Sequence, residues 1–166
     1  LAVSRRRLGM LEPAAACLTS LIRQGAGSYD VLRELGEIRL RQEELDQAED
    51  LLRQAIARDA AKLRAHRSLG HVYAKMGNHA EARKCYQEVL RRQPNDIDAH
   101  LLIAQTWFWE ENFQMTIQAA DEVIALLEAG ADAATTTTAR RVAEMHMLAG
   151  EAHLKLQEAF LARDRF

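Results

Sequence analysis

The feature that most constrains the fold of this chain is a helical pattern that recurs with a fixed period. Residues 63–96 read LRAHRSLGHVYAKMGNHAEARKCYQEVLRRQPND, in which two amphipathic helical patterns meet at Gly77 and end at Pro94. Gly70 and Ala82 are small, so two antiparallel helices can approach closely there, and proline lacks the N–H that would continue the second helix. One such pair cannot bury its apolar face alone, so it must stack on copies of itself.

Copies of this unit occur on both sides at steps of about 34 residues. Leu35-Gly36 precedes Leu69-Gly70 by one step, and Ile103-Ala104 follows it by one step. We therefore expect a partial repeat over 1–28, whole repeats over 29–62 and 63–96, a divergent repeat over 97–130, an insertion over 131–142 and a partial repeat over 143–166.

The two ends depart from the regular pattern. At the N-terminal end we expect a turn at Gly9 between two helices. At the C-terminal end we expect a loop near 132–137, a long helix from about Thr138 to Leu156, and a clipped second helix after it. A chain that opens inside a first helix and ends inside a second one is expected to be an excerpt of a longer array.

The central unit resembles the tetratricopeptide repeat (TPR), a helix–turn–helix of about 34 residues, at positions Leu69, Gly70, Tyr73, Ala82, Tyr86 and Pro94. The resemblance covers nearly the whole chain. It implies an all-α fold, a right-handed superhelical solenoid of antiparallel helix hairpins. The low proline content, two residues in the whole chain, agrees with a helical fold.

Composition excludes several classes of function and leaves the compartment open. A formal charge of -2 gives no basic field for nucleic acid. No apolar run reaches the roughly 18–20 residues that a membrane span needs. Cys17 and Cys85 fall at equivalent repeat positions, too far apart for a disulfide, so we expect two buried thiols. Unpaired cysteines favour a reducing compartment such as the cytoplasm, and the periplasm stays compatible because the true N-terminus need not be included.

We find no catalytic constellation, so the sequence predicts that this chain is not an enzyme. There is no glycine-rich phosphate loop, no G-x-S-x-G and no H-E-x-x-H. His66, His100 and His146 share one repeat position, which places them at least about 8–10 Å apart on successive helices. Zinc ligands lie about 2.0–2.3 Å from one ion, so we expect no metal site and no cofactor.

The TPR resemblance implies that the first helix of each repeat lines a concave groove. These positions form a basic half followed by an apolar half. Trp107 already fills a core position, so Phe108 and Trp109 are the best candidates for exposed binding anchors. The candidate groove residues are Arg33, Arg41, Arg64, Arg67, His71, Lys75, Leu101, Gln105, Phe108, Trp109, Met147 and Leu154.

The function predicted from these features is a non-catalytic scaffold for protein–protein interaction. It would bind a partner peptide or helix in the groove, and the partner would be part acidic and part apolar. The alternative is a regulatory or targeting arm of a larger enzyme or of a secretion or assembly machine. Self-association through the ends of the array is a further possibility. Glu37 argues against a clamp for a C-terminal carboxylate, because its charge would repel one.

Overall fold

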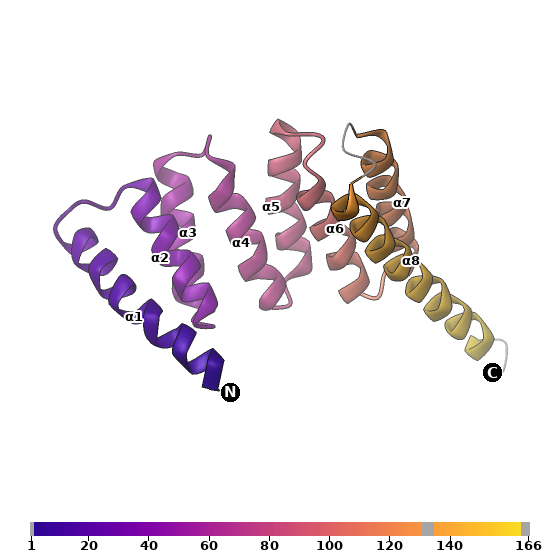
Figure 1. The fold of residues 1–166 in the computed structure, drawn as a ribbon, viewed down its shortest axis with the longest axis horizontal. Helices are drawn as coiled ribbons and strands as arrows, with labels where there is room; N and C mark the ends of the chain where they lie inside the picture. Colours follow the sequence, from indigo (N-terminus) through magenta and orange to yellow (C-terminus); the bar gives the residue numbers. More distant parts are fainter. Residues whose placement is uncertain (1, 131–134, 164–166) are drawn as a thin grey trace. The chain divides into compact units, whose positions relative to one another are not determined.

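The computed structural model describes residues 2–130 and 135–163, with side chains described for 11–130 and 135–160. Within these ranges the chain forms helices joined by short turns and contains no strand (Figure 1). The prediction of an all-α fold is therefore confirmed. The helices are α1 (Ala2–Arg23), α2 (Tyr29–Arg41), α3 (Leu45–Arg58), α4 (Leu63–Lys75), α5 (His79–Arg92), α6 (Ile97–Trp109), α7 (Phe113–Ala129) and α8 (Thr136–Arg163).

The chain divides into two compact units, Leu1–Cys85 and Tyr86–Phe166, and the boundary between them falls within α5. In the first unit α1 packs on α2, α2 on α3, and α3 on α4. In the second unit α6 packs on α7 and α7 on α8, while α8 also contacts α6. Helices that are neighbours in the sequence are thus neighbours in space, as hairpin repeats require.

The core of the first unit is a close contact between α2 and α3. Leu32 and Leu35 of α2 and Leu52 of α3 are almost completely buried. Gly36 allows the contact, because a Cβ atom built on it would lie only 2.8 Å from the Cγ atom of Leu52. In the second unit, the buried residues of α7 and α8 form one cluster that contains Ala120, Val123, Ile124, Leu127, Met145 and Ala149.

The turns inside the hairpins repeat one backbone conformation. Glu43, Gly77 and Glu111 have positive φ values of 64°, 78° and 58°, and they follow one another at the repeat period. In the α6–α7 turn, Glu111 donates its N–H to the carbonyl of Phe108 at 3.0 Å, and Asn112 donates to Trp107 at 3.0 Å. These paired bonds satisfy the last carbonyls of the helix and reverse the chain. The equivalent turns therefore hold each second helix against its first.

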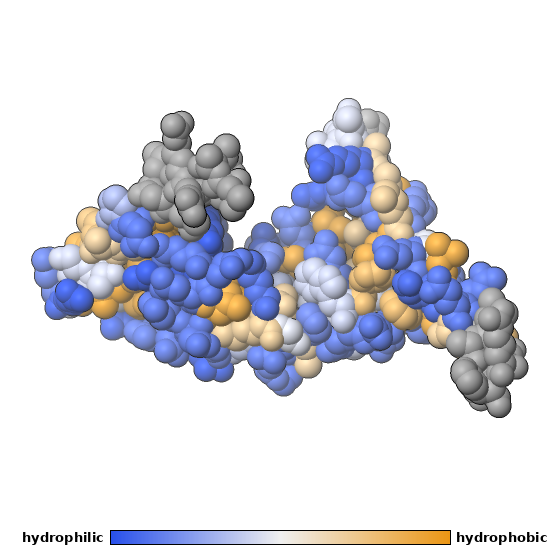
Figure 2. All heavy atoms as spheres, turned by 90° about the horizontal axis from the view of Figure 1, so that it is seen from below, coloured by the Kyte–Doolittle hydropathy of each residue, from blue (hydrophilic) through white to orange (hydrophobic). Residues whose placement is uncertain are grey.

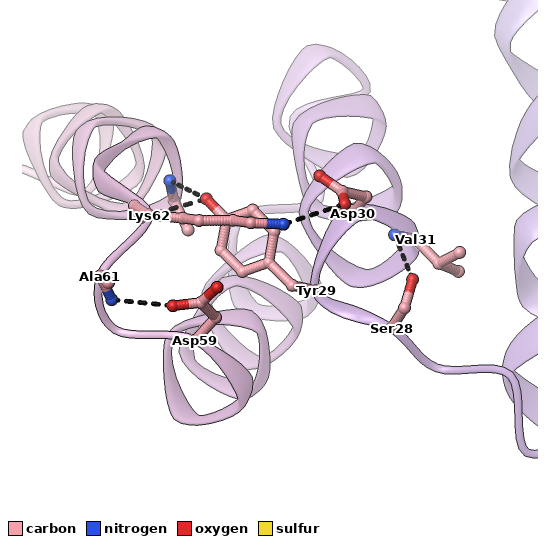
Figure 3. A network of polar contacts seen from close by, with 8 residues as sticks. Ser28, Tyr29, Asp30, Val31, Asp59, Ala61 and Lys62 are labelled. Carbon is pink, nitrogen blue, oxygen red and sulfur yellow. Dashed lines mark hydrogen bonds and ion pairs between the residues drawn. The ribbon is translucent and has the colours of Figure 1, made fainter.

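The first turn of α4 is capped by a side chain from another helix. Ser28, Asp96 and Asn112 cap their own helices with a side-chain oxygen, whereas Lys62 at the same position of α4 makes no such bond. Instead the Tyr29 hydroxyl accepts a bond from the Ala65 N–H at 3.0 Å (Figure 3). This N–H is the one that an N-cap side chain would normally bind.

Three further contacts hold the start of α2 against the start of α4 (Figure 3). The Tyr29 hydroxyl donates to the Lys62 carbonyl at 3.1 Å, and the Lys62 ammonium lies 4.5 Å from the centroid of the Tyr29 ring. Lys62 also pairs with Asp30 at 3.2 Å. Burial raises the pKa of the Tyr29 phenol, so the hydroxyl keeps its proton. The start of α2 thereby fixes the position of α4.

Two predictions about the ends of the chain are wrong. Helix α1 runs from Ala2 to Arg23 without a turn at Gly9 and includes Pro13. Helix α8 begins at Thr136, slightly earlier than expected, and continues to Arg163 with no second helix after Leu156. A single glycine weakens a helix by only about 1 kcal/mol and does not end it unless a cap or a packing partner also changes. Of the predicted loop near 132–137, residues 132–134 lie outside the described residues, and the loop prediction is wrong for Thr136 and Thr137, which belong to α8.

The second helix of the divergent repeat agrees with the sequence. The sequence predicts a helix from near Asn112 to Gly130, because no proline or glycine interrupts it between these two residues. Helix α7 is capped by Asn112, whose side chain accepts a bond from the Met115 N–H at 3.3 Å. It ends with Gly130 as its C-cap residue. The extra length of α7 lets it pack along the long helix α8.

Candidate partner-binding site

The predicted basic residues of the first unit gather mainly on one face of α4. Arg64, Arg67, His71 and Lys75 follow one another at intervals of three or four residues, so they form one stripe along the helix. Arg64 and Lys75 are exposed, whereas Arg67 and His71 are half-buried. We call these four residues the α4 stripe. Its position depends on the Tyr29 contacts, which place the first turn of α4 beside α2.

One charge of the α4 stripe lies beside an acidic side chain of the α2–α3 turn. Lys75 lies 3.6 Å from the carboxylate of Glu43 in the α2–α3 turn, where both side chains are exposed. Burial lowers the pKa of His71, and the positive charge of Arg67 lowers it further, so the imidazole is neutral at pH 7. The stripe therefore presents arginine and lysine charge, and its histidine acts as a neutral hydrogen-bonding group.

The two arginines predicted on α2 differ in their surroundings. Arg33 pairs with Glu37 at 2.7 Å, and Ser68 of α4 donates a hydrogen bond to the same carboxylate oxygen at 3.0 Å. In this bridge the carboxylate of Glu37 compensates the charge of Arg33 and links α2 to α4. Arg41 lies exposed at the end of α2. Arg41 is therefore open to solvent, whereas Arg33 takes part in an ion pair that is bonded to α4.

Two of the predicted apolar residues of the second unit, Phe108 and Trp109, line a pocket. It has a volume of about 450 Å³ and is lined by Phe108, Trp109, Glu111, Phe113, Glu151 and Lys155. We call it the α6–α8 pocket, because its wall comes from the end of α6, the following turn, the start of α7 and the middle of α8. The rings of Phe108 and Phe113 meet edge to face with centroids 5.9 Å apart. Trp109 is 53% exposed, which is unusual for the largest apolar side chain.

The other apolar candidates do not all belong to this pocket. Leu101 of α6 packs against the core cluster of α7 and α8, so it contributes to stability. Gln105 is half-buried on the same helix. Met147 and Leu154 on α8 are 74% and 62% exposed. Figure 2 shows separate groups of hydrophobic residues on a face that is mostly hydrophilic.

Sequence reasoning missed two parts of the pocket. Phe113 begins α7 and Glu111 lies in the turn before it, so neither belongs to a first helix that the resemblance places in the groove. The signal was present, because a turn of the TPR type brings the end of its first helix and the start of its second together. Trp109 and Glu151 are far apart in the sequence, so local spacing does not predict that they line the same pocket.

The structure can also be compared with the sequence analysis of metal ligands and of membrane-spanning segments. No group of three or more His, Cys, Asp or Glu side chains that could hold a metal ion occurs among the residues described. His100 instead lies with its Nε2 atom 2.8 Å from the Pro94 carbonyl oxygen. Within the same described ranges, no helix is both long and apolar enough to cross a membrane.

Both cysteines are unpaired thiols, but their surroundings differ. The prediction that both are buried is wrong for Cys17, which is exposed on α1. Cys85 is half-buried, and burial together with the charge of Glu81 raises the pKa of its thiol to about 11, although Arg53 acts in the opposite direction.

The different environments predict selective alkylation. At pH 8 a thiol of pKa about 11 is ionised in about one molecule per thousand, and only the thiolate reacts. We expect iodoacetamide to modify Cys17 about 100-fold faster than Cys85, as measured by mass spectrometry of peptides over time. A Cys17→Ser variant should show only the slow reaction. Equal rates at the two positions would contradict the burial of Cys85.

Comparisons with known proteins agree with the repeat architecture. Two family models described as tetratricopeptide repeat match the chain, one over residues 1–62 and the other over residues 39–106. The comparison with curated proteins finds no match.

Several solved structures share the fold at low sequence identity. A structure of MamA is 22% identical with a TM-score of 0.71, and the match covers 82% of this chain and 75% of that one. YrrB, described as a TPR protein with an unusual peptide-binding site, is 21% identical with a TM-score of 0.69, covering 87% and 66% of the two chains. The Sgt2 TPR domain from Aspergillus fumigatus is 18% identical with a TM-score of 0.59, covering 75% and 81%.

Proposed function

Because this chain belongs to the tetratricopeptide repeat family, we propose that it is a non-catalytic scaffold that binds a segment of a partner protein through the first helices of its repeats. The observation that carries the proposal is the α6–α8 pocket. An aromatic pocket with a half-exposed tryptophan at its edge is the usual anchor point of a protein interface. The peptide-binding site described for YrrB supports the same class of function.

The pocket would receive a large apolar side chain of the partner. Its volume of about 450 Å³ is within the range of ligand sites, and Phe108 and Phe113 already form an ordered aromatic wall. Burying the exposed part of Trp109 under a partner would remove apolar surface from water. This contact would mainly slow dissociation, because it is lost only when the complex separates.

The α4 stripe would contact acidic residues of the partner. Arg64 is exposed and Arg67 lies one turn further along the same face of α4. Exposed charges of this kind attract an oppositely charged segment over about 8 Å at physiological salt and therefore act mainly on the association rate. The partner would thus need both acidic residues and an apolar anchor.

Binding kinetics of selected peptides test this function. Peptides of random sequence displayed on phage are selected on the full chain, and the binders are synthesised. Trp109→Ala is expected to speed dissociation of the pocket-binding peptides at least tenfold, which is a loss of about 1.4 kcal/mol. Arg64→Glu with Arg67→Glu is expected to slow association of the acidic peptides and to flatten its salt dependence.

Two control variants separate local effects from general ones. Phe160→Ala removes another exposed aromatic of α8 that does not line the pocket. Arg58→Glu changes charge at the exposed end of α3. Both should leave the rates within about twofold of the wild type. If no selected peptide responds to Trp109→Ala or to the α4 charge reversal, these two surfaces are not the binding surfaces.

A further inference from the structure

The α6–α8 pocket combines an aromatic wall with carboxylates at its rim. Phe108, Trp109 and Phe113 supply the apolar surface, and Glu111 and Glu151 line the same space from the turn and from α8. If a partner side chain without charge filled the pocket, it would displace water from Glu111 and Glu151 and would offer their negative charges no positive partner. Removing a carboxylate from water without a partner costs free energy, so the rim favours a guest that brings positive charge.

The carboxylates of the rim outnumber the cations that line the same pocket. Neither Glu111 nor Glu151 has an ion-pair partner among the described residues. The cation that lines the pocket, Lys155, pairs with Glu158 at 3.1 Å. Acidic groups are therefore in excess around the opening.

The backbone fixes one of these acids at the edge of the pocket. Glu111 adopts a φ of 58°, and its N–H bonds to the Phe108 carbonyl at 3.0 Å. This left-handed conformation costs about 1–2 kcal/mol for a residue with a Cβ atom. The Cα atom of Glu111 is therefore held between the end of α6 and the start of α7, and the side chain extends from this fixed position.

We propose that the partner segment entering the α6–α8 pocket carries an arginine or a lysine directly beside its large apolar anchor. The apolar side chain packs on Phe108 and Phe113. The neighbouring cation lies over the exposed ring of Trp109 and meets the carboxylates of Glu111 and Glu151. Cations bind the faces of tryptophan rings more strongly than those of other aromatic side chains, so both features select the same guest. This inference rests on the proposed function and specifies the chemistry of its partner at one surface.

The composition of the selected peptides gives the first test. Peptides that lose binding in Trp109→Ala are sequenced and compared with those that do not. We expect arginine or lysine to be enriched next to the leucine, phenylalanine, isoleucine or tryptophan of the Trp109-dependent peptides. Enrichment of aspartate or glutamate at that place, or no enrichment, would overturn the inference while the proposed function stands. The absence of any Trp109-dependent peptide would overturn the inference, and the proposed function would fail with it only if no peptide responded to the α4 charge reversal either.

Charge removal at the rim gives the second test. For one Trp109-dependent peptide, Glu111→Gln with Glu151→Gln is expected to weaken binding about threefold to tenfold in about 0.05 M salt, and less in about 0.5 M salt. The control Asp121→Asn with Glu128→Gln makes the same change of net charge at exposed positions on α7 outside the pocket and should have an effect below about twofold. Unchanged or tighter binding in the Glu111 and Glu151 variant would overturn the inference.

Discussion

Replacing Gly36 with leucine is expected to lower the free energy of unfolding by about 3 kcal/mol. A Cβ atom at this position would lie 2.8 Å from Cγ and 3.1 Å from Cδ2 of Leu52, a side chain with no exposed surface. Leu52 cannot move outward, because it is enclosed between α2 and α3, so the two helices must separate. Separation reduces the packing of the entire hairpin. The measurement is chemical denaturation followed by circular dichroism.

An exposed glycine supplies the matched control for this variant. Gly150 occupies the equivalent position in the last copy of the repeat, but a Cβ atom there would meet nothing within 4 Å. Gly150→Ala should therefore stabilise α8 by up to about 1 kcal/mol through helix propensity alone. Gly36→Ala should lose stability, because a strain of about 1–3 kcal/mol exceeds the same propensity gain. If both alanine variants shifted stability in the same direction, the close contact at Gly36 would be wrong.

Removing the hydroxyl of Tyr29 is expected to destabilise the first unit by about 2 kcal/mol. Tyr29→Phe keeps the buried ring but deletes the donor to the Lys62 carbonyl and the acceptor of the Ala65 N–H. The Ala65 N–H then lies buried with no partner, which is the costly case for a hydrogen-bonding group. Denaturation of the variant measures the loss, and amide exchange at Ala65 should become faster.

A second substitution should restore part of this loss. Lys62 is the N-cap residue of α4 and has the extended backbone, φ -82° and ψ 107°, that an N-cap requires. In the double variant Tyr29→Phe with Lys62→Asn, the asparagine side chain can accept the Ala65 N–H, and about 1 kcal/mol should return. Lys62→Asn alone should cost about 1 kcal/mol or less, because Tyr29 already satisfies that donor and the lost contacts of Lys62 with Asp30 and the Tyr29 ring are made by an exposed side chain. A double variant no more stable than Tyr29→Phe would show that the cap is not the source of the effect.

The fold was predictable where local pattern and packing agree. The repeat at 63–96 requires small residues at helix crossings and aromatic residues beside them, and Leu69, Gly70 and Tyr73 are buried as expected. The end of α7 was predictable because nothing before Gly130 interrupts the helix. The turn at Gly9 was wrong because a glycine in this setting does not by itself decide between continuing and ending a helix.

The candidate site was predictable in residue type and less so in arrangement. Phe108 and Trp109 were recognised because three successive aromatic residues cannot all face the core of one helix. The ion pair of Arg33 with Glu37 is an i, i+4 contact that local spacing favours, so this pairing could be predicted from the sequence. The approach of Lys75 to Glu43 depends on how α4 packs against the preceding helices. This packing cannot be predicted from the spacing of residues within one helix.

The order of helix contacts in each unit has a kinetic consequence. Nearly every strong contact joins helices that are consecutive in the chain, such as α2 with α3 and α7 with α8. Closing the short turns between them costs little chain entropy, so a hairpin can form before distant segments meet. Folding can therefore start at either α2–α3 or α6–α7 and spread helix by helix, and the rate should resemble that of fast-folding helical proteins.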